Sequence, residues 1–142
     1  KRMIKNLYNT NILRLSSDIP RLGKLDNPQA SSTVVSKLCG SKITVYLNMK
    51  QNIVCDFSHE IKACSLGKAA ASVMARNIVG SKSNELIKIK TEMYNMLKFN
   101  GSPPSGRWND LKFFEPVKDY KGRQASVLLV FDAVENCIND IK

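Results

Sequence analysis

The chain has 142 residues, of which 43% are hydrophobic and 24% charged, with seven glycines and five prolines. This composition is typical of a globular protein and excludes disordered, collagen-like and low-complexity chains. No apolar run reaches the roughly 18 residues of a membrane-spanning helix, so we expect no membrane partner. The formal net charge is +10. Because the lysines and arginines are spread out, without a block and without interleaved aromatics, we also expect no nucleic-acid partner.

The first predicted element is a helix over residues 3–15, where apolar side chains recur at the helical period. Pro20 ends this helix, and the prolines and glycine of residues 18–30 predict an irregular crossing. Residues 1–12 carry no unbroken apolar stretch of the kind that secretory signals have, so we expect a cytoplasmic protein.

A three-stranded antiparallel sheet is predicted over residues 31–63. Apolar and polar side chains alternate over residues 43–47 and again over 53–61, with a turn at 50–52 between the two segments. Residues 31–38 are rich in β-branched side chains and predict the remaining strand.

The rest of the chain, residues 65–141, has helical patterns. Small and apolar residues follow the helical period up to Gly80, which is a typical helix stop. Ser83 is a suitable N-cap for the next helix, and a final helix is predicted over residues 126–141. The order of helix, three strands and further helices predicts an α+β fold, with helices covering the antiparallel sheet, in a single domain over residues 1–142.

The four cysteines fall into two classes. Without an export signal, a reduced chain is a better interpretation than a disulfide scaffold. Cys55 lies on the apolar side of the predicted strand and Cys137 in the last helix, so both are expected to be small buried hydrophobes. Cys39 and Cys64 differ because they stand where predicted elements end.

Cys39 and Cys64 are expected at one edge of the sheet. Cys64 ends the last strand and begins a helix, where the helix dipole and the flanking Lys62 and Lys68 attract an anionic sulfur. Cys39 lies in the turn between the first two strands, which Gly40 allows to bend tightly. In an antiparallel meander these two positions share an edge, where the two thiols would share a metal ion.

Three segments occur in an order known from one protein family. They are Pro20-Arg21-Leu22-Gly23, Leu38-Cys39-Gly40-Ser41 and Ala63-Cys64-Ser65-Leu66-Gly67-Lys68-Ala69-Ala70-Ala71-Ser72. Over nearly its whole length the chain resembles the iron–sulfur cluster assembly scaffolds of the NifU N-terminal, IscU and SufU type. The extended stretch over 99–122 is similar to the insertion that marks the SufU branch.

The resemblance implies a site for iron or a transient [2Fe–2S] cluster, with zinc as an alternative. Cys39 and Cys64 match the first two family ligands, and Cys64 is also the expected acceptor of persulfide sulfur. Ser41 replaces the family's aspartate, and Ser126 stands where its third cysteine belongs. Ser41, Ser126 and His59, the single histidine, are therefore secondary candidates for metal ligands.

The resemblance also implies partners: a cysteine desulfurase that supplies sulfur and acceptor proteins that receive the cluster. A homodimer would provide four thiolates for one bridging cluster. The recognition motif for an Hsp70 chaperone is not in place, so that partner is not implied.

Two alternatives stay open beside a non-enzymatic scaffold. One is a SufU-like sulfurtransferase that relays persulfide sulfur, and the other is a degenerate paralogue that keeps the fold without cluster chemistry.

Overall fold

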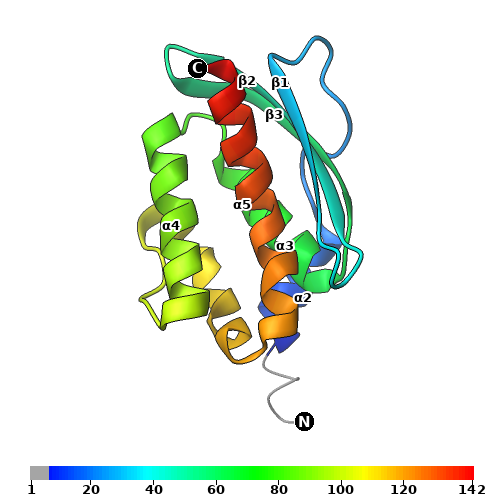
Figure 1. Ribbon diagram of the computed structural model, residues 1–142, viewed down its shortest axis with the longest axis vertical. Coiled ribbons are helices and arrows are strands. Elements are labelled where there is room, and N and C mark those ends of the chain that lie inside the picture. The colour runs from blue at the N-terminus through cyan, green and yellow to red at the C-terminus, as the bar shows by residue number, and fades with distance from the viewer. Residues whose placement is uncertain (1–6) are drawn as a thin grey trace.

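The computed structural model describes residues 7–142 and confirms the α+β fold, with a three-stranded antiparallel sheet and helices (Figure 1). The elements in chain order are α2 (Thr10–Ser17), β1 (Ala30–Val35), β2 (Lys42–Lys50), β3 (Ile53–Lys62), α3 (Ser65–Asn77), α4 (Ser83–Phe99), the 3-10 segment η1 (Gly106–Asp119) and α5 (Lys121–Ile141). Within residues 7–142, no helix has both the length and the apolar character needed to cross a membrane.

The sheet is a meander in the order β1-β2-β3, and α5 packs along one of its faces (Figure 1). Alternate residues of β2, from Ile43 to Met49, are buried on this face. On its other sides α5 contacts α3 and α4, so it is buried nearly all round. Burying apolar surface contributes about 25 cal/mol per Å², so the sheet and α5 together form the centre of the core.

Within the described residues, the predicted helix over residues 3–15 is interrupted: Leu7 is helical, residues 8–9 are not, and α2 begins at Thr10. Asn9 is the N-cap of α2, and its side chain accepts a hydrogen bond of 3.0 Å from the backbone N–H of Ile12. This cap explains why α2 starts at Thr10. Residues 3–6 of the predicted helix lie outside the described part of the chain.

Two other predicted helix starts are wrong. Lys82, and not Ser83, is the N-cap of α4, while the Ser83 hydroxyl donates to Asn52 Oδ1 at 2.7 Å in the β2–β3 turn. Helix α5 begins at Lys121, five residues before the predicted start at Ser126. Because Tyr120 makes no side-chain cap bond, the sequence carries no capping signal at this helix start.

Cys55 is exposed, so its predicted burial is wrong, whereas Cys137 is buried as expected. The ladder between β2 and β3 pairs Asn48 with Asp56 and then Met49 with Val54, which leaves Cys55 as the extra residue of a β-bulge. Val54 is turned inward instead. Burial raises the pKa of the Cys137 thiol to about 12, so this thiol is inert.

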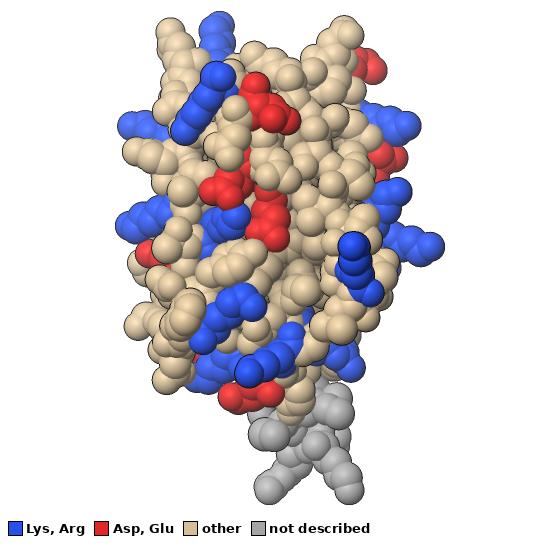
Figure 2. Space-filling model, in the orientation of Figure 1, with Lys and Arg blue, Asp and Glu red and all other residues tan. Residues whose placement is uncertain are grey.

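Lysines and arginines do not gather in one block on the face viewed in Figure 2. They are spread from one end of the molecule to the other, as the sequence suggests.

Candidate functional site

The β1–β2 loop carries Cys39 at one end of the sheet (lower right in Figure 1). The backbone N–H of Ser36 donates to the carbonyl of Ser41 at 2.8 Å, and the N–H of Gly40 donates to the carbonyl of Ser36, also at 2.8 Å. Gly40 has a φ of 73°, a backbone conformation that residues with a Cβ rarely adopt. The loop is therefore a closed turn, and Cys39 stands at its tip.

Cys64 lies between β3 and α3, at the same end of the sheet. It is the N-cap of α3, but its side chain makes no cap bond, while its carbonyl accepts from the Lys68 N–H at 3.0 Å. The thiol is therefore oriented by other contacts. Cys39 and Cys64 are both exposed, and the four cysteines, all within the described residues, are free. The predicted shared edge of the two thiols is thus present in the structure.

A third contribution comes from α5, where Ser126 lies in the second turn and is 3% exposed. Helix α5 comes close to α3 here because Gly67 has no side chain. A Cβ at position 67 would lie 2.6 Å from Ser126 Oγ and 3.2 Å from the Ser126 carbonyl oxygen. Gly67 thus provides the space that Ser126 occupies.

Two cysteines and two serines form one chain of contacts. Ser41 Oγ lies 3.2 Å from Cys39 Sγ and 3.3 Å from Ser126 Oγ, and Ser126 Oγ lies 3.4 Å from Cys64 Sγ. The two thiols, separated by 25 positions in the sequence, are therefore joined through two hydroxyl groups. We call these four side chains the thiol–hydroxyl cluster. It opens into a shallow recess of about 230 Å³, to which Lys62 also contributes.

Electrostatics within the cluster favours an anionic sulfur at Cys39. Partial burial raises the pKa of this thiol, but hydrogen bonds with the Ser36 and Ser41 side chains and with the backbone lower it more, so the pKa lies below its ordinary value. Cys39 Sγ lies 3.4 Å from Ser36 Oγ. The sequence analysis did not single out Ser36, although its position three residues before Cys39 in a tight turn is a usable signal.

His59 is not brought to the cluster. Its side chain is fully buried, its ring stacks on Phe57 with centroids 5.5 Å apart, and its Nε2 lies 3.1 Å from the Pro20 carbonyl oxygen. Burial lowers the pKa of His59, although the Pro20 carbonyl opposes this shift. The imidazole therefore ties the 20–23 crossing to β3 and does not line the recess at Cys64.

The thiol–hydroxyl cluster offers two strong and two weak donors for a metal ion. Among residues 7–142, no three His, Cys, Asp or Glu side chains converge in a way that would hold a metal ion. Thiolates are good ligands for iron and zinc, whereas neutral hydroxyls are weak ones. Iron held here would rest mainly on Cys39 and Cys64, with Ser41 and Ser126 as exchangeable neighbours.

Comparisons with known proteins agree with this geometry. The family model for the NifU-like N terminal domain matches residues 7–126. A crystal structure of a nitrogen-fixing NifU-like protein (N-terminal) from Brucella abortus is 54% identical, covers 98% of this chain and 96% of its own, and superposes with a TM-score of 0.97.

More distant proteins share the fold or the sequence pattern. The iron–sulfur cluster assembly scaffold protein IscU of Thermotoga maritima is 24% identical over 98% of this chain and 97% of its own length. A putative scaffold protein for the SUF system from Fervidobacterium islandicum AW-1 is 22% identical over 94% of this chain and 98% of its own, with a TM-score of 0.87, and so shares the fold. The chain therefore belongs to the NifU N-terminal, IscU and SufU-like family of iron–sulfur cluster assembly scaffolds.

Proposed function

We propose that this protein holds iron and a nascent [2Fe–2S] cluster at Cys39 and Cys64 and passes the cluster to acceptor proteins. The observation that carries the proposal is the thiol–hydroxyl cluster. In it, the positions of all four family ligands lie within a connected set of contacts of 3.2 to 3.4 Å. A single cargo at the recess is therefore within reach of Cys39, Ser41 and Cys64. The buried Ser126 hydroxyl contacts Ser41 and Cys64.

A site of two thiolates and two hydroxyls suits a protein that transfers its bound cluster to another protein. Thiolates bind iron firmly, while hydroxyl oxygens exchange readily with water or with an incoming thiolate. Because Ser41 and Ser126 are the exchangeable neighbours, an acceptor's cysteines would replace them first. The cargo would then leave without breaking all of its bonds at once. A homodimer with one bridging cluster is the other way to complete four thiolates.

Sulfur would reach the recess from a cysteine desulfurase, with Cys64 as acceptor. The Cys64 thiolate attacks the terminal sulfur of the donor's persulfide, a new sulfur–sulfur bond forms, and the donor cysteine leaves as a thiolate. One sulfur–sulfur bond breaks as the other forms, so the transfer needs no oxidant. The exposed position of Cys64 and the absence of a side-chain cap bond support this role.

A sulfur relay without cluster assembly is the second candidate function. The same exposure of Cys64 favours it, because persulfide transfer needs only one accessible thiol. Tetrahedral zinc prefers four ligands from cysteine, histidine and carboxylate side chains. Since this cluster offers two such ligands, the relay would work without zinc.

Anaerobic reconstitution with iron, sulfide and thiol tests the proposal. We expect charge-transfer bands in the visible spectrum, with iron and sulfide bound in near-stoichiometric amounts. Cys39→Ser and Cys64→Ser should each abolish the bands, because each removes one of the two thiolates. Cys55→Ser is the matched control, since this exposed cysteine lies in the β3 bulge and outside the recess.

The other outcomes separate the alternatives. A colourless wild-type protein that still accepts persulfide sulfur at Cys64 would replace the scaffold by the sulfur relay. A protein that binds neither iron nor persulfide sulfur would identify a degenerate paralogue. Bands that persist in both Cys39→Ser and Cys64→Ser would show that the cargo is held elsewhere.

A further inference from the structure

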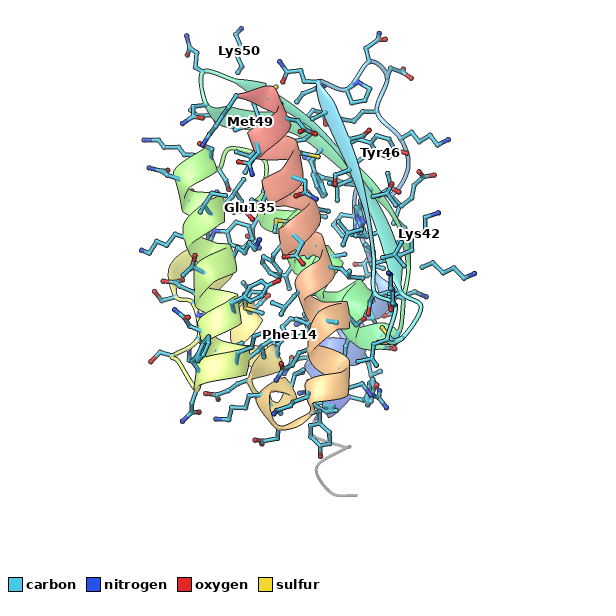
Figure 3. All side chains as sticks on the ribbon, viewed as in Figure 1. Lys42, Tyr46, Met49, Lys50, Phe114 and Glu135 are labelled. Atoms are coloured by element: carbon cyan, nitrogen blue, oxygen red, sulfur yellow. The ribbon has the colours of Figure 1, made fainter. Side chains whose placement is uncertain are left out.

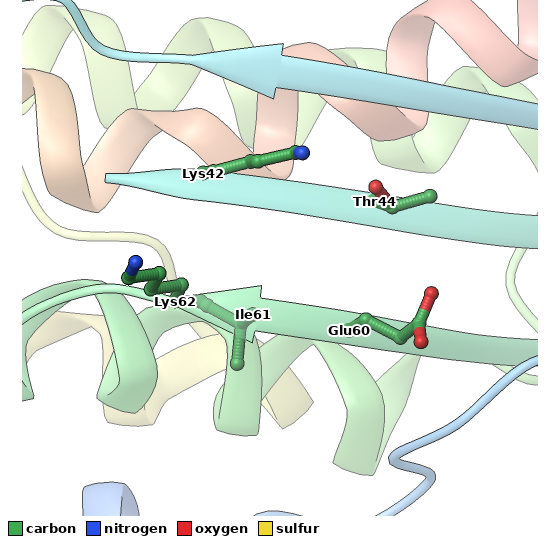
Figure 4. Close-up of a pocket in the computed structure, with 5 residues that line it drawn as sticks. All are labelled: Lys42, Thr44, Glu60, Ile61 and Lys62. Carbon is green, nitrogen blue, oxygen red and sulfur yellow. The ribbon is translucent and has the colours of Figure 1, made fainter. Parts of the chain in front are cut away.

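Two lysines face each other across the strand ends beside the recess. Lys42 at the start of β2 and Lys62 at the end of β3 are direct partners in the antiparallel ladder, so their side chains leave the same face of the sheet (Figure 4). Both are exposed and line a shallow groove of about 310 Å³ with Thr44, Glu60 and Ile61. We call Lys42 and Lys62 the lysine pair.

The lysine pair forms no ion pair within the described chain. Among the ion pairs formed by residues 7–142, none includes Lys42 or Lys62. Glu60, an acid that lines the same groove, accepts a hydrogen bond of 2.6 Å from the Tyr46 hydroxyl. Like charges directly opposite each other across two strands destabilise a sheet. The pair therefore carries a cost for the fold that no ion pair among residues 7–142 offsets.

The lysine pair adjoins the thiols. Lys62 lines both the groove and the recess that contains Cys39 and Cys64. In the sequence, Lys62 lies two residues before Cys64. Lys68, in the first turn of α3, adds a further positive charge four residues after Cys64. An anion that approaches the thiols across this face of the sheet therefore meets two ammonium groups first.

We propose that the lysine pair is an anion-recognition subsite, through which Cys39 and Cys64 react preferentially with anionic persulfides or disulfides. This inference deepens the proposed function, because it specifies the charge of the sulfur compound that the thiols accept. Long-range attraction raises the local concentration of a charged reactant and its association rate. The bond changes are those of thiol exchange: the thiolate attacks one sulfur, a new sulfur–sulfur bond forms, and the other sulfur leaves as a thiolate.

Thiol labelling tests the inference without any metal or cluster. The probes are the dianionic disulfide dithiobis(nitrobenzoate) and the neutral disulfide dithiodipyridine, each followed by stopped-flow absorbance. All proteins carry Cys55→Ser, so that Cys39 and Cys64 are the exposed thiols and Cys137 stays buried. The test variant is Lys42→Gln/Lys62→Gln. The matched control, Lys50→Gln/Lys88→Gln, removes two exposed lysines away from the recess; Lys50 lies at the opposite end of β2 (Figure 3).

We expect the test variant to react about tenfold more slowly with the dianionic probe at low ionic strength. Its rate with the neutral probe should stay within about twofold of wild type, and the control should match wild type with both probes. Because the Debye length is about 10 Å at 0.1 M salt, the difference should shrink above that concentration. A test variant that slows both probes alike, or neither, overturns the inference.

These outcomes are independent of cluster assembly. A protein that fails anaerobic reconstitution but shows the charge-selective labelling keeps the subsite and loses the proposed scaffold role. A protein that reconstitutes but labels without charge selectivity keeps the scaffold role and loses the subsite.

Discussion

A hydroxyl at position 126 limits the number of thiols at the end of the sheet. Ser126 Oγ lies 3.4 Å from Cys64 Sγ and 3.3 Å from Ser41 Oγ, so a side chain at this position reaches both halves of the cluster. The sequence resemblance places the third cysteine of the family pattern at position 126. Because this position lies in α5 and its side chain reaches both Cys64 and Ser41, a ligand here is physically reasonable.

We therefore predict that Ser126→Cys strengthens the retention of a reconstituted cluster. A third thiolate replaces a weak hydroxyl ligand, and loss of the cluster to an added chelator should become about tenfold slower. The measurement is the anaerobic decay of the visible absorbance. Ser126→Ala, which removes the hydroxyl without adding a thiol, should decay no more slowly than wild type. Equal decay of Ser126→Cys and wild type would mean that position 126 does not contact the cargo.

The sequence predicted the positions of Cys39 and Cys64 correctly but not the orientation of Cys55. The pairing of Cys39 with Cys64 followed from the meander alone, because both stand where strands end on the same edge. The orientation of Cys55 did not follow from alternation, since one extra residue in β3 shifts the inward face to Val54. β3 contains no glycine that would mark the bulge in the sequence.

At the scale of elements, the crossing of α3 and α5 decides whether the cluster forms. The two helices meet at Gly67, where a Cβ would lie 2.6 Å from Ser126 Oγ and 2.8 Å from Ala63 Cβ. Both distances are too short for real contacts, so a side chain at position 67 must displace Ser126 of α5 or Ala63, which precedes α3. The sequence resemblance included Gly67 in a motif, but only the helix crossing explains its role.

We predict that Gly67→Ala lowers the free energy of unfolding by about 1–3 kcal/mol, which is the usual cost of overpacking a core. Gly122→Ala is the matched control, because nothing lies within 4 Å of a Cβ at position 122. This control should be neutral or gain at most about 1 kcal/mol, since alanine favours a helix. Urea unfolding followed by circular dichroism measures both values. If Gly67→Ala were as stable as the control, α5 would not be held close to α3 at this point.

The start of α5 shows why element boundaries were harder to predict than element types. Its apolar stripe predicted a helix over 126–141, and that helix is present. The five additional residues begin at Lys121, after a Tyr120 that supplies no capping side chain. The start is fixed instead by packing, because Gln124 is buried and its amide donates to the carbonyls of Leu97 and Lys118.

At the scale of the whole molecule, two buried reporters lie in different layers. Trp108, the single tryptophan of the chain, is in η1, and its Nε1 donates to Glu85 Oε2 of α4 at 2.8 Å. Cys137 lies near the C-terminal end of α5. It faces the sheet, and its Sγ is 3.9 Å from the Val45 carbonyl oxygen. One reporter therefore follows the outer helical layer, and the other follows the contact between α5 and β2.

The contacts of α5 with β1, β2, α3, α4 and η1 join these layers into one core, so we predict that they unfold together. Small single domains of this length usually unfold in one cooperative step. In a protein with Cys39→Ser, Cys55→Ser and Cys64→Ser, urea midpoints from Trp108 fluorescence and from pulse labelling of Cys137 should agree. The single-domain interpretation requires this coincidence, because α5 cannot release the sheet while α4 and η1 stay packed against it. A fluorescence change that precedes Cys137 labelling would instead make α4 and η1 a separate unit.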